Sequence, residues 1–353
     1  MSGRKQHYIP QSLLRSFSAR PDAKAPPVWI YSRKWSIFKT NTLDVAAERE
    51  FYSPVSSDKV TLDDEIMQYE NLLAQQLSAI RASAVGAPID ARLAAETTVH
   101  LAVRNAHIRD AFENVGVEAV AAVSDLFSDE KYSRQKLGVD QESGGELRDT
   151  IRKAISERFP TLNSEKRELI EKISVDITVK QFTSFFERQR PQIEQMVQQI
   201  GTKIEPAAKQ AHAKALSASL APEKRVDDLS KFCWQTLKGK FVLPDSVAVS
   251  CSKGRATPYM IADTDEAEAV FMPVSAQCLL AGFREAQLIE GIDFNRIAAE
   301  CSGDFFIATE RNELLAQLIP LIGNATQAAI RDAVDSAKAE RRASLGILSN
   351  DEN

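Results

Sequence analysis

The stretch that decides the fold of this chain is His7-Tyr8-Ile9-Pro10-Gln11-Ser12-Leu13-Leu14-Arg15-Ser16-Phe17, near the N-terminus. A residue before proline is kept out of the helical region and proline suits the first turn of a helix, so this run is expected to start extended and become helical at Pro10. Its apolar members recur at the spacing of one helix face: Leu13, Leu14 and Phe17. The core can therefore hold the run while His7, Gln11 and Arg15 serve a site. The alternative is that His7 and Gln11 only satisfy backbone groups, the commoner role of isolated polar residues.

Seven motifs carry a family resemblance: His7–Gln11, Leu13–Phe17, Val28–Tyr31, Val45–Tyr52, Phe241–Val247, Pro273–Ser275 and Asp293–Arg296. Together they resemble the bacterial family called domain of unknown function 4238, over most of the chain. One position departs from the pattern, because Val247 stands where the family commonly has proline, and the turn geometry of the family is not carried over there. The resemblance also favours Arg104 as a site residue, since an arginine recurs at such a helix position. It implies no established activity.

The composition is that of a soluble globular protein with room for about two domains, since the chain has 353 residues, 44% hydrophobic and 26% charged. No stretch approaches the roughly 18 consecutive apolar residues of a membrane span, and the polar, basic N-terminus lacks the apolar segment of a secretory signal. The four cysteines are widely separated and form no Cys-x-x-Cys pair. We therefore expect a cytoplasmic protein with reduced cysteines.

Charge is unevenly distributed along the chain. Residues 1–40 hold eight Lys or Arg and one acid, Asp22, so this segment carries +7 within a chain of net charge −5. Aromatic residues are interspersed with these charges: Tyr8, Trp29, Tyr31 and Trp35. Basic and aromatic side chains together are typical of surfaces that bind phosphates and stack on bases. The segment therefore suggests nucleic acid as a partner, and the alternative is a basic face packed against the acidic remainder.

Periodicity divides the chain into four parts. They are a small α/β unit over residues 1–55 with a helical turn from Thr42 to Glu50, a helical block over 61–239, a β-rich segment over 240–310 and a C-terminal helix over 311–346. Two short strands cannot bury a core alone, so we expect the N-terminal strands to join those of 240–310 in one small mixed sheet. The fold class is α+β, mainly α-helical, with a long helical insertion. This sheet would bring His7 and Glu48 toward Asp245.

Within the helical block, a long helix is expected from Asp90 to about Phe127 and another over 227–238. The first carries four polar residues at the spacing of one helix face: Glu96, His100, Arg104 and His107. A rise of ~10.5 Å separates two histidines seven residues apart, which excludes a zinc site built on this helix alone. Arg104 is instead a candidate phosphate or carboxylate clamp, with an ordinary ion pair as the alternative.

Asp245 follows an apolar strand and Pro244, so its carboxylate is expected at a strand end. It could orient a histidine, hold Mg²⁺ or, most commonly for an Asp-Ser pair, cap a turn. The Pro-Asp pair also begins a pattern of restriction-type nucleases, but the acid that this pattern requires is missing from Cys251-Ser252-Lys253. The chain also lacks a Gly-x-Gly-x-x-Gly motif, a phosphate-binding Walker loop and a Gly-x-Ser-x-Gly elbow.

Two functions from different classes follow from these residues. The first is an enzyme or binder acting on nucleic acid or another phosphate-bearing substrate, with His7 and Asp245 as catalytic residues. Substrate binding in that scheme belongs to Gln11, Arg15, Glu48 and Arg104. The second is a non-catalytic regulatory or interaction protein, for example in phage defence or stress response, in which the N-terminal run is a structural seam. Neither function identifies a cofactor, and the oligomeric state is left open.

Overall fold

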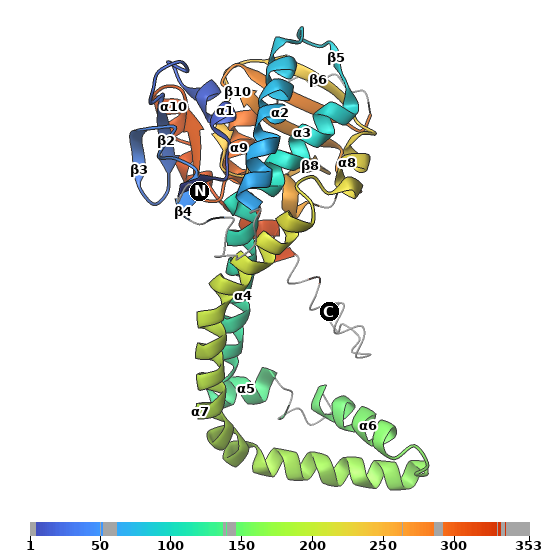
Figure 1. Cartoon of the computed structure of the whole chain (residues 1–353). Helices are drawn as coiled ribbons and strands as arrows, with labels where there is room; N and C mark the ends of the chain where they lie inside the picture. The colour runs from blue at the N-terminus through green and yellow to red at the C-terminus, as the bar shows by residue number, and fades with distance from the viewer. Residues whose placement is uncertain are drawn as a thin grey trace. The chain divides into compact units, whose positions relative to one another are not determined.

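The computed structural model describes residues 5–49, 51, 62–136, 139, 146–262, 264–285, 292–329, 331, 332 and 336. Its chain forms two compact units, shown in Figure 1. Unit 1 comprises residues 1–112 and 207–334, and unit 2 comprises 113–206 and 335–353. The divisions fall inside two helices, α4 (Ala106–Leu126) and α7 (Ser164–Ala218). Unit 1 is therefore built from two separate segments of chain.

Unit 1 contains three sheets whose ladders are antiparallel in the described residues. The largest has the order β5 (Pro88–Ile89), β6 (Cys233–Lys238), β11 (Cys278–Phe283), β10 (Ala269–Ser275), β8 (Val249–Ser252) and β9 (Arg255–Pro258). The second has the order β3 (Ser36–Asn41), β2 (Pro27–Ser32), β12 (Phe305–Ala308) and β7 (Leu243–Pro244). The third pairs β1 (Lys5–His7) with β4 (Ala47–Arg49).

The central strands of the six-stranded sheet are apolar on both faces because both faces are covered. On β10, Val270 and Met272 belong to one core cluster and Phe271 to another. The first cluster packs the sheet against four helices: α1 (Gln11–Leu14), α2 (Leu62–Ala82), α3 (Ala91–Val103) and α8 (Glu223–Leu229). Figure 1 shows α2 and α3 in front of this sheet. The second cluster contains α9 (Phe294–Cys301) and residues of β2 and β12.

The expected pairing between the two ends of the chain is confirmed. Strand β2 pairs with β12, with Ile30 opposite Ile307 and Tyr31 opposite Phe306. The Tyr31 and Phe306 rings stack with centroids 4.9 Å apart, and Tyr31 also packs into the second core cluster. The sheet differs from the expected mixed one in being antiparallel, and most C-terminal strands lie instead in the six-stranded sheet. The N-terminal and C-terminal strands are thus distributed over three sheets, where a single sheet was expected to pair their edges.

Three expected helical segments are different in the structure. The helix expected over 227–238 ends at Leu229 and is followed by strand β6, in which buried and more exposed residues alternate. The helical turn expected from Thr42 is a set of turns followed by β4. The helix expected from Asp90 stops at Val103, and α4 begins at Ala106. In the first two cases strand pairing overrides a local helical pattern. The C-terminal helix expected over 311–346 falls partly outside the described residues.

Unit 2 is helical and has a small core of its own. It contains the later part of α4, α5 (Glu130–Lys136), α6 (Glu146–Arg158) and the first part of α7. Glu171 on α7 is buried and accepts hydrogen bonds from Arg148 Nε at 2.5 Å and Arg152 Nε at 3.0 Å, which fixes α6 on α7. Helix α5 is held by the Arg134 guanidinium, which lies 5.3 Å from the centroid of the Phe182 ring. Buried charge pairing and a few aromatic contacts thus replace an extensive apolar core.

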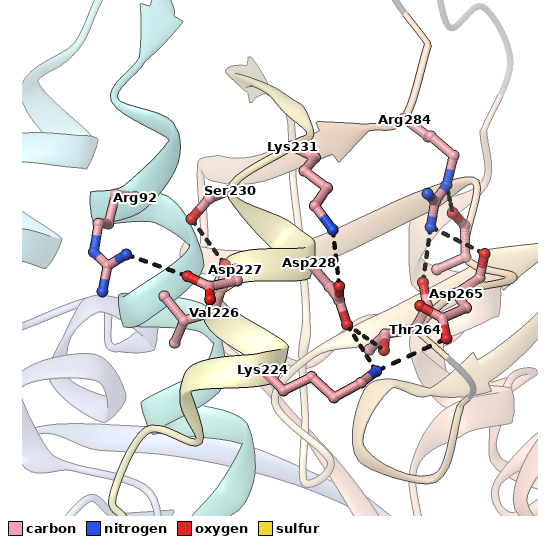
Figure 2. A network of polar contacts seen from close by, with 11 residues as sticks. Arg92, Lys224, Val226, Asp227, Asp228, Ser230, Lys231, Thr264, Asp265 and Arg284 are labelled. Atoms are coloured by element: carbon pink, nitrogen blue, oxygen red, sulfur yellow. Dashed lines mark hydrogen bonds and ion pairs between the residues drawn. The ribbon is translucent and has the colours of Figure 1, made fainter.

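A polar network closes the edge of unit 1 beside α8 (Figure 2). Asp228 is buried and accepts hydrogen bonds from Lys224 at 3.2 Å, Lys231 at 3.1 Å and Thr264 at 3.3 Å. Although burial raises the pKa of Asp228, the two lysines outweigh that effect and hold it below its usual value. Arg284 donates to the main-chain oxygens of Thr264 and Ala267 at 2.8 Å each, so its charge also serves a loop. Because these side chains bind one another and the main chain of a loop, we interpret the network as structural.

Candidate functional site

The polar groups of the N-terminal run converge on one buried residue, Thr42. His7 ends β1 and Gln11 begins α1, so the chain turn at Pro10 brings their side chains to the same side. Gln11 Nε2 donates to the main-chain oxygen of Thr42, and Thr42 Oγ1 donates back to Gln11 Oε1 at 2.9 Å. His7 Nε2 lies 3.2 Å from the same oxygen and 2.7 Å from Gln11 Nε2. Burial lowers the pKa of His7, while the Thr42 carbonyl acts in the opposite direction.

Arg104 lies at the C-terminal end of α3, fully buried, and its guanidinium joins three segments of chain. Its Nη2 donates to Glu70 at 2.7 Å and to the main-chain oxygen of His7 at 3.3 Å. Its Nη1 lies 3.4 Å from Nε2 of His100, whose Nδ1 lies 3.1 Å from the main-chain oxygen of Leu220. Burial and the Arg104 charge lower the pKa of His100 to about 3. His100 is therefore neutral, with Nδ1 donating to Leu220 and Nε2 accepting from Arg104.

Asp245 is placed at the end of β7, as expected, and its carboxylate closes a turn. It accepts from the main-chain nitrogens of Gly303 and Asp304 at 2.7 Å each and from Phe305 at 3.0 Å. Burial raises the pKa of Asp245 to about 7, and the three backbone donors oppose that rise. The commonest use of such an Asp-Ser pair, turn capping, matches this geometry. The adjacent Ser246 hydroxyl is buried with no hydrogen-bond partner in the described part of the chain.

His107 lies near Asp245, beside Gly303. His100 is on α3 and His107 is on α4, so the helix break at 104–105 separates the two histidines. A Cβ atom on Gly303 would lie 2.7 Å from His107 Nδ1 and 3.6 Å from Asp245 Oδ2, so this position requires glycine. His107 Nε2 lies 3.2 Å from the hydroxyl of Thr326. Complete burial lowers the pKa of His107 to about 4, so the ring is neutral. Asp245 and His107 thus both lie beside the position that a side chain at residue 303 would occupy.

The remaining candidates occupy separate contacts. Arg15 Nη1 donates to the main-chain oxygens of Pro21 at 2.9 Å and Ala23 at 3.1 Å, and so holds the loop after the first helix. Glu48 on β4 pairs with Arg109 at 2.6 Å and, more distantly, with Lys209 at 3.6 Å. Both residues therefore have structural partners within unit 1.

Tyr8, next to His7, is not among the site residues that the sequence predicts. Burial raises its pKa, and four carboxylates add to the effect: Asp245, Asp110, Asp304 and Glu48. Its ring packs 5.2 Å from that of Phe51. Its neighbour His7 instead contacts Gln11 and Thr42. The described residues nevertheless include no group of three or more His, Cys, Asp or Glu placed to hold a metal ion.

The most open aromatic group of the N-terminal segment lies on the hairpin β2–β3. Trp35 is 60% exposed and Phe38 is 37% exposed, with the two rings edge to face and centroids 6.4 Å apart. Tyr31 is fully buried, and Trp29 packs against the second core cluster. Exposed aromatic rings and exposed basic side chains therefore occur together on this hairpin. Phe38 was missed from the sequence, because strand alternation alone does not show which face of an edge strand is covered.

Comparison with known families places this geometry in context. The model of a family described as "Protein of unknown function (DUF4238)" matches residues 5–295. The chain belongs to the DUF4238 family. The matched region runs from β1 into α9 and so contains the Thr42 contacts, Arg104 and Asp245. No curated protein and no solved structure matches the chain.

The structure shows what one motif residue does and where this chain departs from the family pattern. The amide of Asn295 accepts from the Val242 nitrogen at 3.0 Å and donates to the Lys240 oxygen at 2.9 Å, so the asparagine holds the strand that leads to Asp245. Val247, at the position where the family pattern has proline, has a φ of 64°. Proline cannot adopt that angle, so the turn of this chain differs from the family pattern at this residue. None of the helices in the described part combines the length and apolar character needed to cross a bilayer.

Proposed function

We propose that the protein is a non-catalytic binder of single-stranded nucleic acid that uses the end of hairpin β2–β3. The observation that carries the proposal is the exposure of Trp35, 60%, on a hairpin that contains no acidic residue between Pro27 and Asn41. An exposed indole is an unusual surface group, and a base stacked on an aromatic ring contributes about 1–3 kcal/mol. Stacking is tolerant of sequence because every base has a π face.

The hairpin end is held in place around Trp35, which reduces the entropy lost on binding. Arg33 Nη1 donates to the main-chain oxygen of Ile322 at 3.0 Å, and Lys34 Nζ pairs with Asp304 at 2.7 Å. Ser36 has a φ of 61°, typical of the residue that closes a three-residue hairpin loop. The two residues before Trp35 are thus anchored, while the indole remains in solvent. Such preorganisation favours affinity.

Charge supports a nucleic-acid ligand over an uncharged one. Arg33, Lys34 and Lys39 give the hairpin three cationic side chains, and Lys39 is exposed on β3. A phosphate backbone that follows the hairpin would meet Lys39 and Arg33 while a base stacks on Trp35; the charge of Lys34 is already paired with Asp304. The polar groups of His7 and Gln11 bind Thr42, which supports the non-catalytic alternative over the enzyme.

The test is fluorescence anisotropy of labelled dT and U oligonucleotides with the full chain. Trp35→Ala is expected to weaken binding roughly 5- to 150-fold, the equivalent of one lost stacking contact, and Trp35→Phe should retain part of the affinity. Leu314→Ala is the matched control, because Leu314 is also apolar and 71% exposed but lies on α10 (Glu313–Ala316). Lys39→Ala should reduce the salt dependence by about 0.7 in the slope of log K against log salt.

Two results would contradict the proposal. Equal affinities of the wild-type chain and Trp35→Ala would show that the hairpin does not form the binding surface. Mg²⁺-dependent cleavage of the oligonucleotide that disappears in Asp245→Asn would instead support the enzyme, with Asp245 acting in catalysis.

A further inference from the structure

A second feature of unit 1 lies where the four-stranded sheet opens between β7 and β12. A cavity of about 270 Å³ is bounded there by residues 240–242 on one side and 308–310 on the other. Its volume is just below the ~300 Å³ lower end of typical small-ligand sites. The cavity therefore suits a small ligand or a short segment of chain.

The cavity exists because a strand ladder stops early. Strands β7 and β12 pair with Leu243 opposite Ile307 and Pro244 opposite Phe306. Continuation of that register would place Phe241 opposite Thr309. The Phe241 nitrogen instead donates to the main-chain oxygen of Ala276 at 2.9 Å. The chain before β7 is thus diverted from β12, and a gap takes the place of the next ladder pairs.

Asn295 keeps the gap open. Its amide forms two hydrogen bonds with the main chain of Lys240 and Val242, at 2.9 and 3.0 Å. An amide that both donates and accepts in this way imitates a strand partner, so the diverted segment has its main-chain groups satisfied without β12. The opening is therefore a constructed part of the fold, supported by the asparagine of a DUF4238 motif.

Thr309 on the opposite wall shows what the gap lacks. Its Oγ1 atom is buried and has no hydrogen-bond partner in the described part of the chain. A buried hydroxyl without a partner costs about 1–3 kcal/mol, so a ligand that offers a hydrogen-bonding group there is favoured. By strand alternation, the main chain at 309 faces the same edge as Phe305, which accepts a hydrogen bond from the Asp245 nitrogen. The nitrogen that would pair with residue 309 is the diverted one of Phe241.

We propose that this cavity binds a short extended peptide segment of a partner, which pairs with the end of β12 and hydrogen-bonds Thr309. The gap has the register of a missing ladder pair, so a peptide amide supplies both the donor and the acceptor that the site requires. Phe241, Val242 and Leu315 give the lining an apolar surface for one small side chain. The mouth carries an exposed ion pair of opposite charges, Lys240 with Glu310 at 3.4 Å, which fits an uncharged peptide segment.

The probe is the blocked tripeptide acetyl-Val-Ala-Val-amide, titrated into the full chain and followed by amide NMR shifts and by the melting temperature. Saturable binding is expected, with shifts at residues 308–310 and a raised midpoint. The matched ligand is acetyl-Val-Pro-Val-amide, which lacks the central N–H, and it should bind at least about fivefold more weakly, the value of one hydrogen bond.

Two variants complete the test. Thr309→Val is expected to weaken tripeptide binding by a similar factor, while its unliganded midpoint stays equal or rises because the unpartnered hydroxyl is gone. Ala276→Leu should fill the cavity and abolish binding, and it retains the main-chain oxygen that Phe241 requires. Thr40→Val on β3 is the control. Equal binding of the two tripeptides, undiminished binding to Ala276→Leu, or no binding of the first tripeptide at millimolar concentration would each overturn the proposal.

Discussion

The guanidinium of Arg104 donates to the main-chain oxygen of His7, 3.3 Å away, and thereby ties the end of α3 to the end of β1. The same guanidinium pairs with Glu70 on α2 and contacts His100. Three segments of unit 1 therefore depend on one buried charge. The hydrogen bond gives a physical link between Arg104 and the N-terminal motif, which is 97 residues away in the sequence.

Replacement of Arg104 should be severe for stability. Arg104→Lys removes the planar fork that reaches Glu70 and the His7 oxygen together, and Arg104→Met leaves both groups unpaired. Because the Glu70 side chain is 36% exposed, the cost should be that of unpaired polar groups, about 1–3 kcal/mol, and below that of a fully buried ion pair; urea denaturation measures it. Arg92→Lys is the control, because Arg92 likewise has three partners, all carboxylates, but is half exposed, and its replacement should cost under about 1 kcal/mol. Equal effects of the two lysine substitutions would contradict a special function of Arg104.

Asp245→Asn should destabilise unit 1 although it is nearly isosteric. One amide oxygen cannot serve three backbone donors, so at least one N–H among Gly303–Phe305 loses its partner, at about 1–3 kcal/mol. The neighbouring Ser246→Ala is the matched control and should be neutral or slightly stabilising, because its buried hydroxyl has no partner in the described part of the chain. Denaturant midpoints of the two variants decide the question. A stable Asp245→Asn chain would mean that the carboxylate is not the closure of this turn.

Stability should fall as pH decreases from about 6.5 to 4. The pKa of His107 is about 4 in the folded chain and 6.5 in the unfolded one, so between these values the unfolded state binds more protons and stability rises with pH. Between pH 6.5 and 4, His107 contributes roughly 3 kcal/mol to the decrease in the free energy of unfolding, and His100 acts in the same direction. Asp245 acts oppositely, since its raised pKa makes stability fall as pH rises from 3.8 to about 7.

The comparison for this prediction is between two variants at each pH. His107→Gln should flatten the dependence of the unfolding free energy between pH 4 and 6.5. Thr326→Val removes the hydroxyl that contacts His107 but no titrating group, so it should lower the whole curve without changing that slope. Identical slopes in the wild-type chain and His107→Gln would show that His107 is not the group responsible.

Val247→Pro, which restores the family pattern, is expected to destabilise this chain. The φ of 64° is inaccessible to proline, and the Val247 nitrogen donates to the Pro244 oxygen at 3.0 Å, a bond that proline cannot make. The loss should be about 3 kcal/mol or more, read as a lowered melting temperature. Val247→Ala separates the loss of packing from this backbone effect. If the proline variant melts at or above the alanine variant, the turn at this residue follows the family geometry after all.

Residue spacing in the sequence predicted the buried face of the first helix and the need of the N-terminal strands for a partner strand. The apolar spacing of Leu13, Leu14 and Phe17 gave a buried face, and the strand pair that could not form a core alone indicated a partner elsewhere in the chain. The strand 233–238 was read as a helix because its six residues are short enough to fit either period. Its neighbours β5 and β11, which supply the pairing, lie far away in the sequence.

The candidate site was less accessible to sequence reasoning for the same reason. Side-chain types identified His7, Gln11 and Arg104 as unusual, and the structure gives all three hydrogen-bonded partners. Their partners Thr42 and Glu70 carry no signal of their own, because threonine and glutamate are ordinary surface residues. Exposure of Trp35 could not be predicted, since an indole in a short hairpin packs inward or outward according to what covers the sheet.

The pairing of β2 with β12 has a consequence for synthesis of the chain. The hydroxyl of Tyr31 binds the main-chain oxygen of Glu310, which is synthesised 279 residues later, so strand β2 cannot pair with β12 until then. At about 5–20 residues per second, translation leaves the N-terminal hairpin without its neighbouring strand for on the order of 14 to 56 s. During that interval an apolar strand edge is open to other nascent chains. The ribosome therefore releases the first strands of this protein long before they can fold, and occupancy by a holding chaperone during translation would protect them.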